Sequence, residues 1–378
     1  MARKKLPVLK RKLKALSFMN SYTQGSSGGD VLFVELTKRW KGVEHTVCTS
    51  ALGEQFCRMK GLTNANFVIS TEETEFRGII TTYVLRILIG LKIALSLRSI
   101  PDIIYVSSDI PCDTFPASIL KIRAKITGKT CKWVQKFYHI NDPKRKLSYS
   151  TQILSLALLR RFADVFVGCS QESVDLLKKR GFPESILHVV KPGANIVLPT
   201  KTENSEYSAV FVGRIHPSKG IDDLLLVWKE VLLNKPRAKL ALIGKGEENM
   251  MCFYQSKIEA LGLSDCIKML GFVPDNEVSR LLSGTRLLVF PSHEEGYGMA
   301  VAEAIAHGCQ VVTYDLPVFQ TEFGSNLIRV ACYDTNVFAQ KVIDCMDNNR
   351  QINCPDFIRS WEQASKEEFE IIENQFVI

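Results

Sequence analysis

The stretch that decides the fold is Pro291-Ser-His-Glu-Glu-Gly-Tyr-Gly-Met-Ala-Val-Ala-Glu-Ala-Ile-Ala-His-Gly-Cys-Gln-Val-Val312. The apolar run 287–290 before it predicts a buried strand, and the Ala-rich run 299–306 predicts a helix that ends at Gly308. Residues 295–298 are therefore predicted to form the turn between the strand and the helix. Glycines there let a ligand lie against bare backbone, and the first helical amides have no intrahelical partner, so the turn is a candidate anion site.

Two carboxylates accompany this turn. Glu295 lies in the turn and Glu303 in the helix, with seven residues between them. A single ligand could contact the amides with its phosphates and both carboxylates with its hydroxyls, which describes a nucleotide-sugar. The alternative is an ordinary strand–helix unit with solvated glutamates, and for either glutamate alone that alternative is favoured. Two glycines, two glutamates and a phosphate-binding helix start together favour the ligand site.

This stretch resembles the Glu-x7-Glu signature of retaining glycosyltransferases of family four, the glycosyl transferases group 1, and the similarity runs from about Ser17 to Glu373. The resemblance implies the GT-B fold, in which two doubly wound, Rossmann-like α/β domains face each other across a cleft. It implies transfer of a hexosyl group from a UDP- or GDP-sugar to a glycan or lipid-linked acceptor, with retention of anomeric configuration. Neither a cofactor nor a metal is expected beyond the nucleotide-sugar co-substrate.

The length of 378 residues predicts two domains, since a single hydrophobic core rarely grows so large. The polar segment 199–208 predicts a linker, which gives an acceptor-side domain at 1–195 and a nucleotide-sugar domain at 196–356. Residues 357–378 contain Trp361 and resemble the family's last helix, which crosses back to the first domain. The 11 scattered cysteines, with no CxxC pair, and a basic N-terminus without a secretory apolar run favour a cytoplasmic protein.

The first half begins with a strand, a Gly-rich turn, a helix and a second strand, which is a βαβ unit. Gly28 and Gly29 lie in this turn, before Asp30, and would let donor phosphates or an acceptor approach the backbone. A glycine-rich turn is weak by itself, and a tight turn needs no ligand. The resemblance adds that the family carries a Gly-Gly at this turn, facing the cleft. No role is predicted for Asp30.

His139 follows the predicted strand 131–138, at the carboxyl end where open α/β sheets place groups that contact ligands. A lone histidine is more often structural. The resemblance implies that a histidine at this strand end reaches the donor sugar, so a site role is predicted for His139.

The second half begins with a predicted strand at 207–212, followed by Gly213, Arg214 and, after His216, Lys219. Arg214 and Lys219 could bind one anionic group from two sides, and the resemblance implies that this group is the donor diphosphate. His216 is expected to be exposed, without a role. Residues 315–323, after a predicted strand at 311–314, are expected to form a loop.

The resemblance assigns the site residue by residue. It implies catalytic roles for His139, Arg214, Lys219 and Glu295. It implies donor contacts for Gly28, Gly29, Gly213, Val273, Gly296, Tyr297, Gly298, Met299, Ala300 and Glu303, with the backbone near Val273 meeting the nucleobase.

Charge is unevenly distributed: residues 1–195 carry a net +16 and the remainder −8, within the total of +8. Segment 78–97 predicts an amphipathic helix with Arg86 and Lys92 on its polar arc, and nine basic residues lie between Lys121 and Lys146. These features predict that the first domain docks on an anionic membrane face or a phosphate-bearing acceptor. A helix packed on the sheet and a solvated surface are the alternatives. Nucleic acid is not expected, because no binding motif accompanies the charge.

Two other functions compete with transfer. The first is a non-catalytic GT-B scaffold, against which the presence of Arg214, Lys219, Glu295 and Glu303 argues. The second is a nucleotide-sugar epimerase, which would need further acid–base residues that are not evident. The sequence has no Asp-x-Asp metal motif, so protein cations are expected to stabilise the leaving diphosphate.

Overall fold

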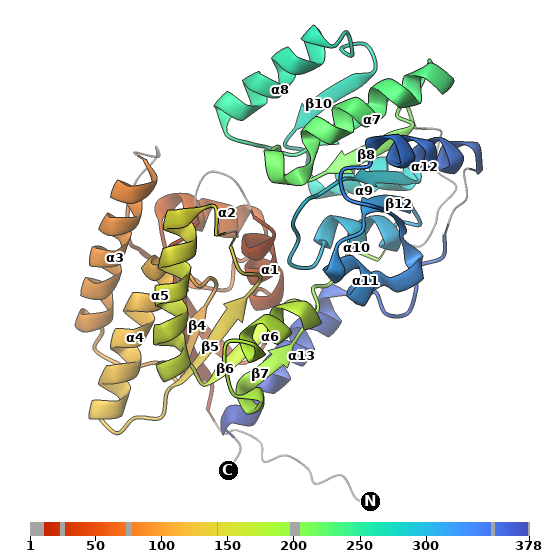
Figure 1. The fold of residues 1–378 in the computed structure, drawn as a ribbon. Helices are drawn as coiled ribbons and strands as arrows, with labels where there is room; N and C mark the ends of the chain where they lie inside the picture. Colours follow the sequence, from red (N-terminus) through yellow and green to blue (C-terminus); the bar gives the residue numbers. More distant parts are fainter. Residues whose placement is uncertain are drawn as a thin grey trace, which may run out of the picture. The chain divides into compact units, whose positions relative to one another are not determined.

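The computed structural model describes residues 11–22, 27–72, 78–141, 143–196, 205–348 and 352–376. The chain divides into two compact units: unit 1 contains Met1–Lys191 and Trp361–Ile378, and unit 2 contains Pro192–Ser360. Each unit is built on a parallel sheet (Figure 1), so the predicted pair of Rossmann-like α/β structures is confirmed. The basic leader 3–10, turn residues 23–26 and linker residues 197–204 lie outside the described residues.

Unit 1 has a seven-stranded sheet in the order β3-β2-β1-β4-β5-β6-β7, with every recorded pairing parallel. Its strands are β1 (Leu13–Met19), β2 (Val43–Thr49), β3 (Asn66–Ile69), β4 (Ile103–Val106), β5 (Lys132–Phe137), β6 (Val165–Gly168) and β7 (Leu187–Val189). β4 and β6 are buried along their whole length, which explains why they read as unbroken apolar runs rather than alternating ones.

The helices of unit 1 cover both faces of this sheet. They are α1 (Gly28–Thr37), α2 (Ala51–Met59), α3 (Ile79–Ser96), α4 (Pro111–Ile126), α5 (Lys146–Phe162), α6 (Gln171–Lys178) and α13 (Trp361–Glu373). Right-handed crossovers run from β1 to β2 in one direction and from β4 to β5 in the other, so α1 and α4 lie on opposite faces. α4 packs against both α3 and α5 (Figure 1), over a core that contains Trp133, Phe137 and Leu156.

A buried ionic group attaches α13 to the sheet of unit 1. Glu368 of α13 pairs with Lys136 of β5, and neither side chain is exposed. Tyr105 Oη of β4 donates to the second oxygen, Glu368 Oε1, at 2.7 Å. Burial raises the pKa of Tyr105 well above its usual range, which keeps this hydroxyl protonated and able to donate.

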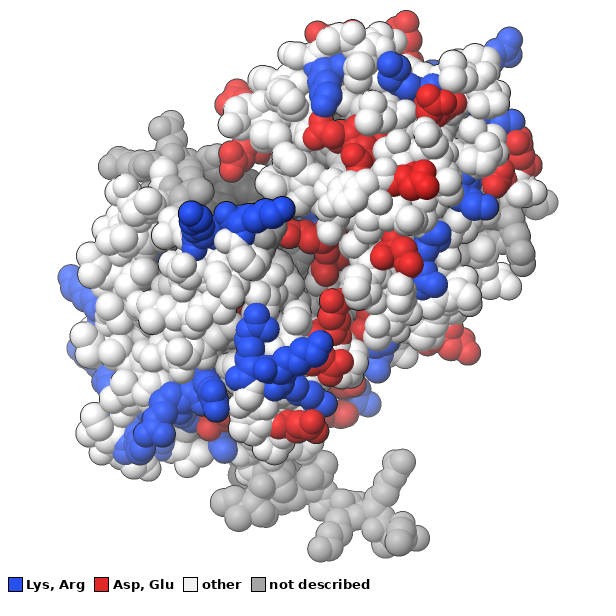
Figure 2. Space-filling model, in the orientation of Figure 1, with Lys and Arg blue, Asp and Glu red and all other residues white. Residues whose placement is uncertain are grey.

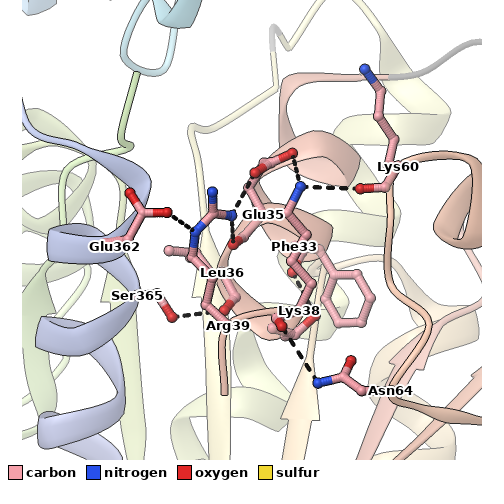
Figure 3. Close-up of polar contacts among 10 residues, drawn as sticks. Phe33, Glu35, Leu36, Lys38, Arg39, Lys60, Asn64, Glu362 and Ser365 are labelled. Carbon is pink, nitrogen blue, oxygen red and sulfur yellow. Dashed lines mark hydrogen bonds and ion pairs between the residues drawn. The ribbon is translucent and has the colours of Figure 1, made fainter. Parts of the chain in front are cut away.

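More accessible polar contacts join α13 to α1 (Figure 3). Arg39 lies just past the end of α1 and bridges Glu35 and Glu362 Oε1, the latter at 2.8 Å. Ser365 Oγ donates to the carbonyl of Leu36 at 2.7 Å. The segment that contains α13 therefore completes unit 1, although 169 residues of unit 2 precede it after Lys191.

Unit 2 has a six-stranded sheet in the order β10-β9-β8-β11-β12-β13. Its strands are β8 (Ala209–Val212), β9 (Leu240–Ile243), β10 (Ile267–Gly271), β11 (Leu287–Phe290), β12 (Gln310–Tyr314) and β13 (Ile328–Val330). Its helices are α7 (Ile221–Asn234), α8 (Glu248–Ala260), α9 (Asp275–Thr285), α10 (Met299–Ala306), α11 (Pro317–Phe323) and α12 (Thr335–Asn348). The predicted strand 287–290 and helix 299–306 are confirmed to the residue.

The loop predicted at 315–323 is wrong, because residues 317–323 form helix α11. Pro317 occupies its first position, where a proline's missing N–H removes no hydrogen bond, and Gly324 follows its last residue. Seven residues make only two turns, too few for the apolar periodicity that identifies a longer helix.

The polar arc predicted for segment 78–97 also needs correction. Arg86 is fully buried and donates from Nη1 to the carbonyls of Asn20 and Tyr22 at the end of β1. The arc around Arg86 therefore faces the protein and the opposite, apolar side faces outward. None of the helices in the described ranges is long and apolar enough to cross a bilayer.

Removing Glu368 should destabilise the protein severely. Glu368→Ala leaves Lys136 buried without its counter-charge, which we expect to lower the free energy of unfolding by roughly 3–5 kcal/mol. The matched control is Glu362→Ala on the same helix, because the Glu362 side chain is 72% exposed and its loss should cost about 0–1 kcal/mol.

Urea titration of both variants measures this difference, and equal losses would contradict it. A third variant, Lys136→Met with Glu368→Leu, removes both charges and should recover much of the stability that Glu368→Ala loses.

Candidate functional site

The donor-side residues of unit 2 gather where the strand order reverses. β8 and β11 are neighbours, but the chain leaves β8 toward β9 and leaves β11 toward β12, on opposite sides. Their two following loops therefore end at the same carboxyl edge, where open α/β sheets bind ligands. The β8 loop contains Gly213, Arg214 and the short 3-10 helix Pro217–Lys219, and the β11 loop is residues 291–298.

A tight backbone contact joins these loops. Gly220 has φ +67°, and a Cβ atom placed on it would lie 1.8 Å from the carbonyl oxygen of Pro291. The amide of His293 donates to the carbonyl of Ser218 at 2.9 Å. Only glycine fits at position 220, for reasons of both backbone conformation and space.

Lys219 and Glu295 form an ion pair across the same two loops. Lys219 Nζ donates to Glu295 Oε1 at 2.6 Å and to the carbonyl of Glu294 at 3.2 Å. Ser292 Oγ donates to the same Glu295 oxygen at 2.9 Å. Both charged side chains are largely buried, with exposed fractions of 14% and 12%. A cation and a carboxylate, 76 residues apart in the chain, are thus held together at the edge of the sheet.

The start of α10 is supported by α11, the helix that the sequence did not predict. Gly298 has φ +99°, and a Cβ atom there would lie 2.6 Å from the ring of Phe319. The buried ring of Tyr297 packs against Phe323, with ring centroids 5.3 Å apart. The first amides of α10, beginning at Met299, have no carbonyl acceptor within the helix and remain suited to an anion.

The remaining predicted donor residues lie around this edge. Glu303 and Ala300 are half-buried on α10, and Glu303 also accepts from the amide of His307 through its carbonyl at 3.1 Å. Val273 follows β10, the strand at one end of the sheet, and precedes α9. Arg214 is exposed and has no ion-pair partner among the described side chains. Its guanidinium is therefore available to a ligand.

A cluster that the sequence did not reveal braces the β11 loop. His293 Nε2 lies 2.9 Å from Asp223 Oδ2 at the start of α7, and Tyr314 Oη donates to the same oxygen at 2.7 Å. His293 also stacks on the ring of Tyr314. The adjacent acidic residues after Gly220 were the only sequence signal. His216, expected to be exposed without a role, instead caps the 3-10 helix by accepting from the amide of Ser218.

In unit 1, the two predicted glycines are the first residues of α1. Ser27 and Asp30 cap this helix reciprocally, which supplies a role for Asp30 that the sequence left open. A Cβ atom on Gly29 would lie 2.9 Å from the ring of Tyr138, whose hydroxyl donates to the carbonyl of Ser107 at 2.8 Å. Gly29 is thus required by close packing, and its neighbour Gly28 carries no comparable contact.

His139 follows β5 at the same edge of unit 1 and is half-buried. Gln152 of α5 donates to the carbonyl of His139 at 2.8 Å and to Asp109 Oδ2 at 2.6 Å. Desolvation raises the pKa of the Asp109 carboxyl, and the hydrogen bond from Gln152 opposes that rise. Asp109 and Gln152 are polar groups at the ligand edge that sequence reasoning missed, because each lies alone in its segment.

The structure thus brings Gly213, Lys219, Glu295, the glycines of the β11 loop and Glu303 to one edge of unit 2. Gly28, Gly29 and His139 lie at the corresponding edge of unit 1. Within the ranges that the structure describes, no three His, Cys, Asp or Glu side chains form a group suited to a metal ion. Unit 2 offers a cation, hydrogen-bonding carboxylates and helix amides, which suits a ligand with phosphates and hydroxyls.

Comparison with known proteins confirms the resemblance. Residues 199–366 match the family described as glycosyl transferases group 1. The D-inositol 3-phosphate glycosyltransferase of Segniliparus rotundus is 34% identical over 110 residues, which are 29% of this chain and 24% of that protein. The poly(glycerol-phosphate) alpha-glucosyltransferase of Bacillus subtilis is 26% identical over 200 residues, or 48% and 28% of the two chains. The chain therefore spans about a quarter of these relatives' length.

Solved structures match nearly the whole chain. HepE of Anabaena, in complex with UDP and glucose, gives a TM-score of 0.75 at 16% identity and covers 96% of this chain and 100% of its own. Sucrose-phosphate synthase from Thermosynechococcus elongatus gives 0.72 at 13% identity, with coverage of 96% and 99%. At these identities the likeness shows the fold, which is GT-B.

The contact between Gly220 and Pro291 can be tested by adding one methyl group. Gly220→Ala forces a Cβ atom into the Pro291 carbonyl and should displace the β11 loop. Gly262→Ala is the matched control, because Gly262 has nearly the same φ, +69°, with nothing within 4 Å of its Cβ position. We expect the control to lose about 1–2 kcal/mol of unfolding free energy from backbone strain alone, and Gly220→Ala to lose clearly more in urea titrations. Equal losses would show that the two loops do not depend on this contact.

Proposed function

We propose that this chain, whose residues 199–366 belong to the glycosyl transferases group 1, transfers a sugar from a nucleotide-diphosphate donor to an acceptor with retention of anomeric configuration. The main support is the pair formed by Lys219 and Glu295 beside the first amides of α10. In this arrangement the donor diphosphate meets Arg214, Lys219 and the amides, and Glu295 accepts a hydrogen bond from a sugar hydroxyl. Glu303 accepts hydrogen bonds from the ribose.

The nucleotide is proposed to be uridine diphosphate, with guanosine diphosphate as the alternative. Solved structures of HepE hold UDP with glucose and UDP-glucose, and TarM was solved with UDP. The backbone after β10, near Val273, is the proposed contact of the base. The sugar is proposed to be a hexosyl group, consistent with the glucosyltransferase among the relatives.

The reaction breaks the bond between the anomeric carbon and the diphosphate oxygen and forms a bond from that carbon to an acceptor hydroxyl oxygen on the same face. The hydroxyl proton passes to the departing phosphate oxygen. Negative charge grows on the diphosphate as this bond breaks, and preorganised cations and amides stabilise it. Lys219 already lies in a largely buried ion pair, so its position requires little rearrangement. We propose that these protein groups suffice without a metal ion.

The acceptor is proposed to be a glycan or a lipid-linked molecule held by unit 1, with His139 near the donor sugar. The protein is proposed to act in the cytoplasm, peripherally on the inner membrane face. A non-catalytic scaffold or an epimerase remains the competing function. A screen of nucleotide-sugars by thermal shift, followed by transfer assays with each donor that binds, separates these functions, because a bound donor raises the unfolding temperature.

Arg214→Ala and Lys219→Ala should each reduce turnover by roughly a hundred- to a thousandfold, because each removes one preorganised group that stabilises the leaving diphosphate. Lys229→Ala is the control, since Lys229 is an exposed lysine on α7 of the same unit. Turnover is measured by nucleotide release in buffer that contains a chelator. Near-normal transfer by both site variants would refute the assignment, and activity that returns only with added manganese would refute metal independence.

Glu303→Ala should weaken binding of the nucleoside diphosphate. Losing a hydrogen bond to a charged group costs about 1.5–3 kcal/mol, which corresponds to roughly ten- to a hundredfold in affinity. Glu230→Ala, an exposed glutamate on α7, provides the control. Calorimetry with UDP and with GDP measures both variants, and an unchanged affinity for Glu303→Ala would show that this carboxylate does not contact the nucleotide.

A further inference from the structure

Helix α3 is amphipathic in the opposite sense to the usual one. Thr82, Arg86, Gly90 and Ala94 recur every four residues, and all four are buried. Arg86 satisfies two backbone carbonyls at the end of β1, so its charge is used inside unit 1. The inward side of α3 is therefore polar or small, and its larger apolar side chains lie elsewhere.

Those side chains form a stripe on the outer side of α3. Ile80, Val84, Leu88 and Leu95 are 65%, 50%, 60% and 61% exposed, and Leu85 beside them is 42% exposed. Spacings of four, four and seven residues place the first four on one side of the helix. Single exposed leucines are common on protein surfaces, but a continuous apolar stripe marks an interaction site.

The apolar surface continues onto the two helices beside α3. α4 packs against α3 and exposes Ile122 and Ile126, and α5 packs against α4 and exposes Leu147 and Leu154. Figure 2 shows the surface over these helices as mostly white, with lysine and arginine side chains at its edges. The outer faces of α3, α4 and α5 are called the docking face below.

The charge of the docking face has one sign. Across α3, α4 and α5 the only acidic residue is Asp113, and it is fully buried. Exposed basic residues lie on or next to the same helices: Lys92, Lys125, Lys129, Arg160 and Arg161. The basic run 121–146 contributes less than its sequence indicated, since Lys136 is buried against Glu368 and Lys121 is paired with Asp164.

We propose that the docking face binds an anionic lipid bilayer, with the outer stripe of α3 entering the interface and the surrounding lysines and arginines lying against the headgroups. Aliphatic side chains flanked by cations match such a surface in both hydrophobicity and charge. A second copy of this chain would bring two basic faces together, which opposes a symmetric contact. The exposed large apolar residues of α3, α4 and α5 include no aromatic ring on which nucleic-acid bases could stack.

The position of the stripe connects it to the reaction. A helix that follows a parallel strand starts at the carboxyl edge of the sheet, so α3 and α5 both begin at the edge where Gly29 and His139 lie. A bilayer in contact with Ile80 and Val84 would present lipid headgroups beside this edge. This step rests on the proposed function, and it identifies the acceptor as a lipid-linked molecule at the membrane surface.

The test is co-sedimentation of the full chain with vesicles of phosphatidylcholine alone or mixed with phosphatidylglycerol, at low and raised salt. We expect binding to the mixed vesicles that weakens with salt. Val84→Ser with Leu88→Ser should reduce the vesicle partition coefficient by about tenfold or more. The matched control is Leu226→Ser with Leu233→Ser, which changes two exposed leucines of α7 in unit 2 and should leave partition unchanged.

Equal partition of the Val84/Leu88 variant and the wild type, or equal recovery with neutral and anionic vesicles, would overturn the proposal. A concentration-dependent dimer in gel filtration that this variant abolishes would also overturn it, by assigning the face to self-association. UDP affinity of each variant is measured in parallel. Unchanged UDP affinity with lost vesicle binding supports the docking face, whereas failure of every variant and the wild type to bind UDP concerns the proposed function alone.

Discussion

The donor-side site depends on one place where two backbone segments approach too closely for any side chain. Gly220 lies against the carbonyl of Pro291, and this contact fixes the end of the β8 loop to the start of the β11 loop. Lys219 precedes Gly220 directly, so its ammonium group is delivered to Glu295 by the same constraint. The reversal of strand order between β8 and β11 creates the edge, and the glycine contact determines what the edge presents. Chemistry and architecture meet within a few residues of each loop.

Features encoded within a short stretch could be predicted from the sequence. Strand β11 and helix α10 were predicted to the residue, because an apolar run, a glycine turn and a helix-ending glycine occur in succession. The pair of Lys219 with Glu295 could not be predicted, since the partners are 76 residues apart and each has an ordinary local context. α11 was missed for lack of length, although Phe319 and Phe323 form the surface on which Gly298 and Tyr297 rest.

The helix α3 shows a different limit of sequence reasoning. A helical wheel separates polar from apolar residues, but it does not say which side faces the core. The guanidinium of Arg86 finds its acceptors in carbonyls more than 60 residues earlier in the chain, so no local signal places it inside. Lys136 behaves similarly, because its counter-charge Glu368 lies 232 residues later. Both cations were counted toward a basic surface from the sequence, and both instead stabilise the interior of unit 1.

The return of α13 to unit 1 has a consequence for the order in which this protein is made. Translation produces all strands of unit 1 first, then the whole of unit 2, and only then Glu368, which neutralises the buried Lys136. Unit 2 is continuous in the chain, so it has all its own residues before unit 1 has its last helix. The sheet of unit 1 must therefore wait on the ribosome with a charged interior position uncompensated, during the synthesis of 169 further residues. The half of the protein that is synthesised first is the half that is completed last.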